Sequence, residues 1–440
     1  MTTTHVGSAT PPTADHPHND LPSASHTSDT NTNSTARGEQ AANPATGQAA
    51  TANTPATAGP VLPDPRTVVV LATARDLDVT TRLRGAAAAV RSLGRPVRTV
   101  LIDTGSPTST ALAAHPPTEV EDARTVSAPG LCWGAAVARG LAYARDVRVD
   151  TVVLLGPDEP ADNPASPRAA GFAAAVTELE VQKKPGVVCS PQARPWWQDP
   201  LSLHVLRPLC LPSLGIAPLD PAGATLVLSA AAVTAALQPQ WGLDDITGLR
   251  PHGLSILTAV RHAGLSVSQT PARQPVADHF RPAKVPSIIN PGVFATVLPA
   301  ALRLGALRAP ACRASLPAAR LPLKGAVAYP PPPGMLMALA QRCADEARAG
   351  RAAADTWPDP LVTAWRQARG PRVDLTALAE DLWPPYLRWL TSCYRDAIDV
   401  ACADPTGVVD HCVARAERAA KDFLDAIVPS FAGHTRDGQR

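Results

Sequence analysis

The sequence carries little charge and has almost no excess of either sign. Asp, Glu, Lys and Arg make up 18% of its 440 residues, and the formal net charge is +2 at pH 7. Proteins that bind nucleic acid or acidic lipid usually present a strong field of one sign. We therefore expect no nucleic-acid partner.

The cysteines lack the spacing of a metal site or a disulfide framework. Eight are present, and no two of them form a C-x-x-C pair. Scattered cysteines of this kind are typical of a reducing compartment. We therefore expect neither a zinc site nor disulfides, and a cytoplasmic location.

Two kinds of apolar segment are also missing. The N-terminus has no basic start followed by an apolar run and a small-residue cleavage site, so we expect no secretory signal. The longest uncharged stretches beyond residue 65, 221–243 and 285–302, contain internal proline and amide residues. They have too few large apolar side chains for a membrane helix, so we expect no membrane span.

The first part of the chain has no Phe, Trp or Tyr. Residues 1–65 consist mainly of Thr, Ala, Ser, Pro, Asn, Gly and His. Such a segment buries too little apolar surface to offset the entropy lost on ordering, so we predict a disordered tail. Weak metal binding by its histidines is the alternative interpretation, and low-complexity composition favours the tail.

Strands and helices alternate from Thr67 onward. The β-branched runs 67–72 and 97–102 predict buried strands, and apolar positions at helical spacing predict a helix over 80–93 between them. The pattern continues with helices over 135–144 and 169–179 and strands over 151–155 and 186–189. This alternation indicates an α/β fold with a doubly wound, mostly parallel sheet. In such a sheet, ligands bind beyond the carboxyl ends of the strands.

The later part of the chain changes character. Helices are expected over 202–211, 229–237 and 254–263, and strands over 224–228 and 265–269. Four consecutive prolines, Pro330–Pro333, then predict a linker. Beyond them the helical periodicity continues without a strand signal. We therefore predict an α/β domain over 66–328 and an all-helical C-terminal domain over 335–440.

Three acidic residues each follow one of the predicted strands. Asp76 comes after the first strand, Asp103 after the second and Asp158 after the strand at 151–155. A carboxylate at a strand end can accept hydrogen bonds from a ribose or a base, and one beside a diphosphate can hold a divalent cation. Because Asp is also common in turns, each residue alone also fits an ordinary loop.

The segments around these residues resemble those of glycosyltransferases with the A-type fold. The run 101–106 is similar to their V-D-D-G-S segment, 129–141 to their G-K-G-x-A-x-x-x-G-L helix start, and 152–158 to the strand that ends in their Asp-x-Asp motif. The later blocks 206–209 and 252–254 resemble those of glucosyl-3-phosphoglycerate synthases and mannosylglycerate synthases.

The resemblance implies transfer of a sugar, with retention, from a nucleotide diphosphate sugar to a small carboxylate-bearing acceptor such as glycerate or phosphoglycerate. It implies that Asp158 and His279 hold Mg²⁺ or Mn²⁺. Asp76, Asp103 and Asp158 would contact the nucleotide, and Arg207 would hold the acceptor through its planar guanidinium. Without the resemblance, we would interpret His279 and Arg207 as ordinary packed or solvated residues. A homo-oligomer is left open as a further partner.

Four positions depart from the family pattern, and each departure removes charge. Gly156 replaces the first acid of Asp-x-Asp, Leu131 stands at the family lysine, and Ala224 and Ser255 stand at expected acidic positions. The first hypothesis is an active, metal-dependent hexosyltransferase. The alternative is a catalytically degraded relative that serves as a binding or scaffold protein. A nucleotidyltransferase is disfavoured because the segment 72–76 lacks a glycine-rich loop.

Six tryptophans admit two interpretations, a sugar-stacking surface or core packing. They lie in a predicted loop and among apolar helical positions, and core packing is the better-supported interpretation. They are Trp196, Trp197, Trp357, Trp365, Trp383 and Trp389.

Overall fold

The structure is a computed structural model of the chain. It describes residues 66–73, 79–103, 124–127, 133–156, 167–192, 195–222, 225–241, 252–273, 288–306, 331, 334–348, 356–370, 372–404 and 407–432. All of these belong to the compact unit Pro60–Arg440. The predicted tail over 1–65 lies outside the described residues.

The described strands form a seven-stranded mixed sheet in the order β3-β2-β1-β4-β6-β5-β7. The strands are β1 Val68–Thr73, β2 Val97–Asp103, β3 Arg124–Ser127, β4 Thr151–Leu154, β5 Val187–Ser190, β6 Thr225–Ser229 and β7 Val267–Gln269. Only β6 runs antiparallel to its neighbours in this sheet. The arrangement confirms the predicted α/β class with a mostly parallel sheet.

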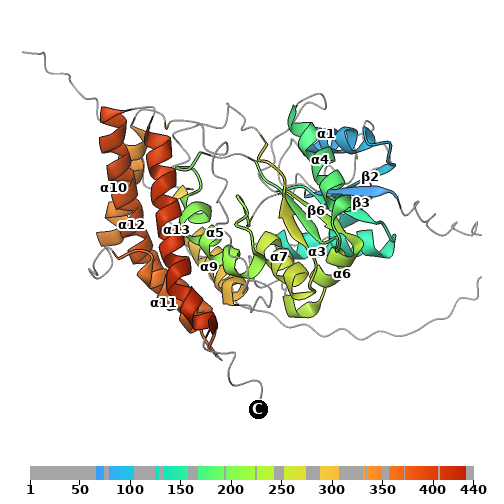
Figure 1. Ribbon diagram of the computed structural model, residues 1–440. Coiled ribbons are helices and arrows are strands. Elements are labelled where there is room, and N and C mark those ends of the chain that lie inside the picture. The colour runs from blue at the N-terminus through green and yellow to red at the C-terminus, as the bar shows by residue number, and fades with distance from the viewer. Residues whose placement is uncertain are drawn as a thin grey trace, which may run out of the picture. The chain divides into compact units, whose positions relative to one another are not determined.

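Helices cover both faces of the sheet (Figure 1). They are α1 Val79–Arg91, α3 Trp133–Asp146, α4 Pro167–Val181, α6 Ala230–Ala236 and α7 His252–His262. Because side chains of a strand alternate between faces, β1 gives Val68 and Val70 to the core under α1 and α4. It gives Val69 and Leu71 to the core under α3 and α6. Strands buried on both faces explain the unbroken β-branched runs in the sequence.

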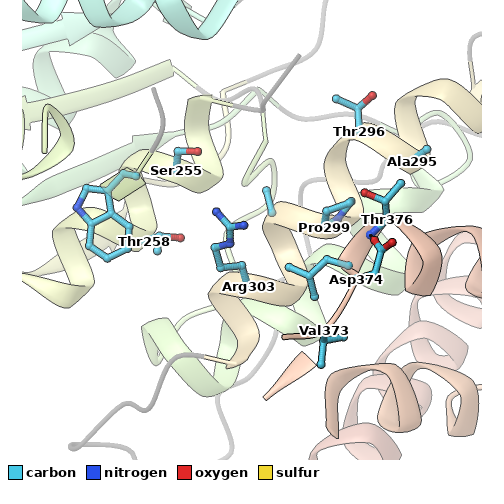
Figure 2. Close-up of a pocket in the computed structure, with 12 residues that line it drawn as sticks. Ser255, Thr258, Ala295, Thr296, Pro299, Arg303, Val373, Asp374 and Thr376 are labelled. Atoms are coloured by element: carbon cyan, nitrogen blue, oxygen red, sulfur yellow. Dashed lines mark hydrogen bonds between the residues drawn. The ribbon is translucent and has the colours of Figure 1, made fainter. Parts of the chain in front are cut away.

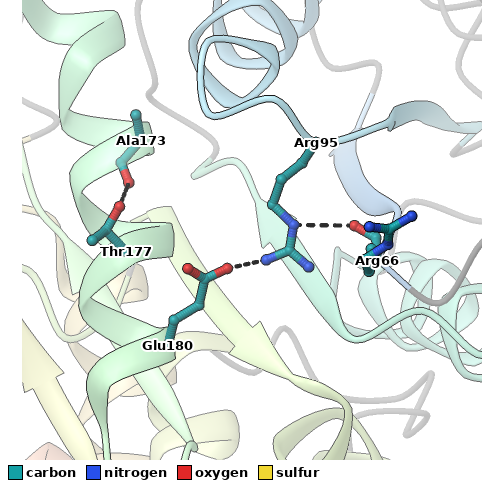
Figure 3. A network of polar contacts seen from close by, with 5 residues as sticks. All are labelled: Arg66, Arg95, Ala173, Thr177 and Glu180. Carbon is teal, nitrogen blue, oxygen red and sulfur yellow. Dashed lines mark hydrogen bonds and ion pairs between the residues drawn. The ribbon is translucent and has the colours of Figure 1, made fainter.

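A network of hydrogen bonds and an ion pair links the amino end of β1 to α4 (Figure 3). The Nε atom of Arg95 donates to the backbone carbonyl of Arg66 at 3.1 Å, and its guanidinium pairs with Glu180. Within α4, the Thr177 hydroxyl donates to the carbonyl of Ala173 at 3.1 Å. Partial exposure limits the stabilisation from the ion pair to about 1 kcal/mol or less. The network lies at the edge opposite the carboxyl ends of β1 and β4.

The described residues from 288 onward are helical and contain no strand, which confirms the predicted helical C-terminal region. Its helices are α9 Pro291–Ala306, α10 Met335–Arg348, α11 Asp359–Ala368, α12 Leu375–Ala403 and α13 Val408–Ala432. A π-helical turn, η1 Ser202–Leu206, and α5 Arg207–Leu214 pack among these helices although they come much earlier in the chain. None of the described helices has the length and apolarity needed to cross a membrane.

The α3 face of the sheet and the C-terminal helices share one apolar core. The ring of Trp196 lies 5.9 Å from that of Tyr394 on α12, and the indole of Trp365 on α11 donates to the carbonyl of Gly305 on α9 at 2.6 Å. Trp196, Trp197 and Trp365 are at most 4% exposed, so the expected core packing is confirmed for them. The predicted boundary near residue 328 lies outside the described residues, and the division into two domains stays a prediction.

Candidate functional site

The three acidic positions singled out from the sequence follow three strands that are neighbours in the sheet. β2, β1 and β4 are adjacent and parallel, so their carboxyl ends meet at one edge. In register, Thr73 pairs with Ile102 and Leu71 with Leu154. The chain reverses its direction of travel across the sheet between β1 and β4, and sheets of this kind bind ligands at such a switch point. We call this edge the carboxyl edge; the carboxyl end of β5 and the start of β6 lie at it as well.

Of the predicted nucleotide and metal residues, the structure describes Asp103. Asp103 is the last residue of β2, where its Cα pairs with that of Ser127. Asp76 and Asp158 lie outside the described residues, in the segments that follow β1 and β4. His279 also lies outside the described residues, as do Leu131 and Ala224.

Gly156, the first position of the altered Asp-x-Asp segment, is buried and held from two sides. Its N–H donates to the hydroxyl of Thr225 at the start of β6, at 3.0 Å. Its carbonyl accepts a hydrogen bond from the guanidinium of Arg82 at 3.3 Å. One residue earlier, the N–H of Leu155 donates to the carbonyl of Leu71 at 2.9 Å. The last two described residues after β4 are therefore held by β1, β6 and α1 together.

Arg82 is a site residue that the sequence analysis missed. It lies in the first turn of α1 and is only 2% exposed, so a guanidinium is buried at the carboxyl edge. A signal for it exists in the sequence. Arg82 stands four residues before Ala86 and next to Leu83, both of which are buried. The signal is an arginine on the apolar stripe of the first helix after the first strand.

A second buried arginine lies at the carboxyl end of β5. Arg273 is 5% exposed, donates to the carbonyl of Ser190 at 3.0 Å, and lies over the ring of Phe172 at 4.5 Å from its centroid. Gly171 on α4 leaves room for it, because a Cβ there would lie 2.4 Å from the Cδ atom of Arg273. The two arginines contact the same face of the sheet, the face that α1 and α4 cover.

Arg207, the predicted acceptor residue, lies in the interior. It begins α5, is 1% exposed, and packs where α5 meets α9 and α13. None of its side-chain nitrogens has a hydrogen-bond partner among the residues that the structure describes. Burial lowers the pKa of Arg207 to about 10, although the fields of Glu417 and Asp199 favour its charged form. Its contact with an acceptor stays a prediction.

The block around His252 and Ser255 also reaches the carboxyl edge. α7 begins at His252, and a Cβ on Gly253 would lie 2.6 Å from the carbonyl oxygen of Pro221 and 2.8 Å from that of Ala222. These two residues precede β6, whose start pairs with the carboxyl ends of β4 and β5. The first turn of α7 therefore lies against the segment that enters the sheet at this edge.

The described residues bring together no group of three His, Cys, Asp or Glu side chains that could hold a metal ion. The two ligands implied by the resemblance, Asp158 and His279, are outside the described part of the chain. They supply one carboxylate and one imidazole. Mg²⁺ prefers oxygen ligands and would have to complete its coordination with phosphate oxygens and water.

Comparison with known proteins adds little. No family model matches the chain, and no curated protein matches it. A solved structure titled "Crystal Structure of a Mycobacterial Protein" is 19% identical, with a TM-score of 0.32, over 55% of this chain and 73% of that one. A similarity this weak supports no conclusion about fold or function.

Proposed function

We propose that the chain is a glycosyltransferase of the A-type fold, which transfers a sugar from a nucleotide diphosphate sugar to a small carboxylate-bearing acceptor. The observation that carries the proposal is the meeting of β2, β1 and β4 at the carboxyl edge. Asp103 ends one of these strands, and Asp76 and Asp158 follow the other two. A mixed sheet with this strand order is compatible with such a fold.

The charge at the carboxyl edge supports the same proposal. A nucleotide diphosphate sugar brings a diphosphate, and the sequence has Leu131 where the resemblance predicts a lysine. Arg82 and Arg273 place two buried guanidinium groups on one side of the edge. Arginine keeps its charge when buried and stabilises phosphate charge. We infer that these arginines take the role of the missing lysine at the diphosphate.

The remaining roles follow from chemistry and stay part of the proposal. Asp103 would accept hydrogen bonds from the nucleoside. Asp158 and His279 would hold Mg²⁺ or Mn²⁺, which supplies neutralisation of the charge that develops on the leaving diphosphate. The anomeric C–O bond to the diphosphate would break, a bond from an acceptor hydroxyl oxygen to the same carbon would form, and the hydroxyl proton would leave with the diphosphate.

The test is release of nucleotide diphosphate by the purified full chain with UDP- and GDP-sugars, Mg²⁺ or Mn²⁺, and small hydroxy acids. We expect release with one donor class, and at least about a tenfold loss in Asp158→Asn, because a charged ligand contact is worth about 1.5–3 kcal/mol. Asp150→Asn is the matched control, since Asp150 precedes β4 at its amino end. Release that stays at background across the donor panel would rule out the active transferase.

Gly156 favours a second candidate, a binding or scaffold protein that has lost catalysis. This buried glycine occupies the position of the first carboxylate, and both of its backbone polar groups are engaged. Such a protein would bind a nucleotide diphosphate sugar and be stabilised against heating, without releasing nucleotide. Measuring binding and turnover on the same samples separates the two candidates.

A further inference from the structure

A pocket of about 410 Å³ opens between α7, α9 and the start of α12 (Figure 2). Ser255 and Thr258 line it from α7, and Thr296 lines it from α9. Asp374, the residue before α12, and the indole of Trp241, which precedes α7 in the chain, also line it. The volume suits a ligand of small-molecule size.

Two of the hydroxyl groups in the pocket are already engaged as donors. Thr258 donates to the carbonyl of Leu254, and Thr296 donates to that of Gly292, each at 2.6 Å. A hydroxyl has one proton and two lone pairs, so each of these oxygens has only lone pairs left for a ligand. Both positions can therefore accept hydrogen bonds from a ligand and cannot donate to one.

Asp374 adds a third acceptor. Its Oδ1 atom caps α12 by accepting from the N–H groups of Thr376 and Ala377, at 2.9 and 3.1 Å. Its Oδ2 atom makes no hydrogen bond with the residues that the structure describes. An ionised carboxylate oxygen can only accept. Three acceptors around one pocket favour a ligand that carries several O–H groups.

Ser255 and Trp241 provide donors and an apolar surface. Ser255 is 7% exposed, and its hydroxyl makes no hydrogen bond with a described residue. The ring of Trp241 is held by an edge contact with His262, at 5.0 Å between centroids. An indole combines a large apolar face with a single N–H donor. This pairing suits a molecule with C–H groups on one face and hydroxyls around its rim.

The charges at the pocket favour a neutral ligand. Arg303 extends from α9 between the α7 side and the α12 side, where Asp374 lies (Figure 2). Arg303 already interacts elsewhere in the fold, so it is not counted as an anchor for the ligand. An anionic ligand would meet the carboxylate of Asp374, and a cationic ligand would meet the guanidinium of Arg303. Like charges brought together in this way oppose binding.

We propose that this pocket binds a neutral sugar in its pyranose form. The sugar hydroxyls donate to Thr258, Thr296 and Asp374, and one of them accepts from Ser255. The C–H face of the ring packs on the indole of Trp241. A ligand without O–H groups would leave the buried hydroxyl of Ser255 unpaired, which costs free energy.

The pocket is separate from the nucleotide site proposed at the carboxyl edge. α7 meets the segment that enters β6 at this edge through Gly253. Thr258 follows five residues later, about 7 Å along the helix axis. Trp241 lies against His262, the last residue of α7. We therefore assign the pocket to a free sugar, and this assignment does not rest on the proposed function.

Calorimetry on the full chain without nucleotide tests the binding. The probes are glucose and mannose, each compared with its uronic acid and its amino sugar, which keep the ring and add one charge of either sign. We expect saturable binding of at least one neutral sugar. Its two charged counterparts should bind at least about fivefold more weakly, because each meets a like charge at the pocket.

Two variants test the hydrogen bonds. Ser255→Ala removes a donor, and Thr258→Val removes an acceptor while nearly keeping the shape of the side chain. Each should weaken binding of the neutral sugar about fivefold, the factor expected for one lost neutral hydrogen bond. Ser92→Ala, which removes a hydroxyl at the end of α1, is the matched control and should leave the affinity unchanged. Thermal unfolding of the same samples shows that each variant is folded.

Three results would overturn the proposal. They are no binding of either neutral sugar, tighter binding of a charged counterpart, and affinities of both pocket variants equal to that of the unaltered chain. Displacement of the sugar by UDP or GDP would overturn the separation from the carboxyl edge. Asp158→Ala distinguishes this proposal from the proposed function, because it should abolish release of nucleotide diphosphate and leave binding of the free sugar intact.

Discussion

His204 is a buried histidine in the π-helical turn η1. It is 4% exposed, and its ring meets that of Trp389 edge-on at 5.8 Å. Burial, and then the positive charge of Arg415, lower the pKa of His204 to about 3. The unfolded chain therefore binds one more proton than the folded chain between pH 6.5 and about pH 3, so stability falls as the pH drops through this window.

We predict that His204 alone removes about 2 kcal/mol of folding free energy between pH 6.5 and about pH 4.5. Urea unfolding at several pH values measures this loss. In His204→Phe the loss of folding free energy over this pH range should be smaller by about 2 kcal/mol. His262→Gln is the control, because His262 is exposed. Parallel slopes for the Phe variant and the unaltered chain would show that His204 titrates normally.

Arg82 is expected to matter for nucleotide binding more than for folding. Arg82→Gln removes a cation from the carboxyl edge and the hydrogen bond to the carbonyl of Gly156. We predict about a tenfold weaker affinity for GDP or UDP by calorimetry, at a cost of about 1 kcal/mol in stability. Arg91→Gln, at the other end of α1, should change neither quantity. Unchanged nucleotide affinity in Arg82→Gln would exclude it from the site.

The sequence placed the end of β2 to within one residue, because strand ends are readable from β-branched runs. Asp103 ends a strand that pairs with β1, as predicted. The apolar stripe of α1 carries a signal for Arg82, but its contact with the carbonyl of Gly156, like that of Arg273 with the carbonyl of Ser190, depends on long-range folding that a local pattern does not give. Arg207 was singled out from the sequence as an acceptor residue. Its burial could not be predicted, because its side chain lies where α5 meets helices from the far end of the chain.

Helix packing at two glycines gives a graded prediction. A Cβ on Gly140 of α3 would lie 2.5 Å from the Cδ1 atom of Ile102, a side-chain end that can rotate away. A Cβ on Gly253 would meet two backbone carbonyl oxygens that cannot. We therefore expect Gly140→Ala to cost about 1 kcal/mol and Gly253→Ala about 3 kcal/mol. Urea unfolding ranks the two, and a larger loss for Gly140→Ala would contradict the packing described for α7.

Sequence periodicity predicts most strands of the sheet, but it does not predict β3. The other strands lie within a few residues of the ranges that periodicity predicts. No periodicity predicts Arg124–Ser127, four residues at the edge of the sheet with a charged first position. Short edge strands carry little apolar signal because only one neighbour defines them. Strand order and the antiparallel direction of β6 are likewise set by long-range pairing.

The shared apolar core leads to a prediction about truncation. Trp196 packs on Tyr394 and His204 on Trp389, so removing α10–α13 would expose the apolar surface around η1 and α5. We predict that a fragment ending at residue 328 is insoluble or binds a hydrophobic dye, and that co-expression with residues 329–440 restores it. A soluble fragment with the thermal stability of the full chain would instead establish two independent domains.

The segment between β5 and the reversed strand β6 limits how the C-terminal helices can be exchanged between related proteins. Its partner β5 ends at Ser190, and the chain returns to the sheet only at Thr225, after η1 and α5 have packed among the C-terminal helices. Both ends of this excursion lie at the carboxyl edge, where Ser190 accepts from Arg273 and Thr225 from Gly156. Recombination that swaps the C-terminal helices between relatives would therefore disturb the edge itself. We therefore expect that suppressors of damage at one of the two regions arise in the other.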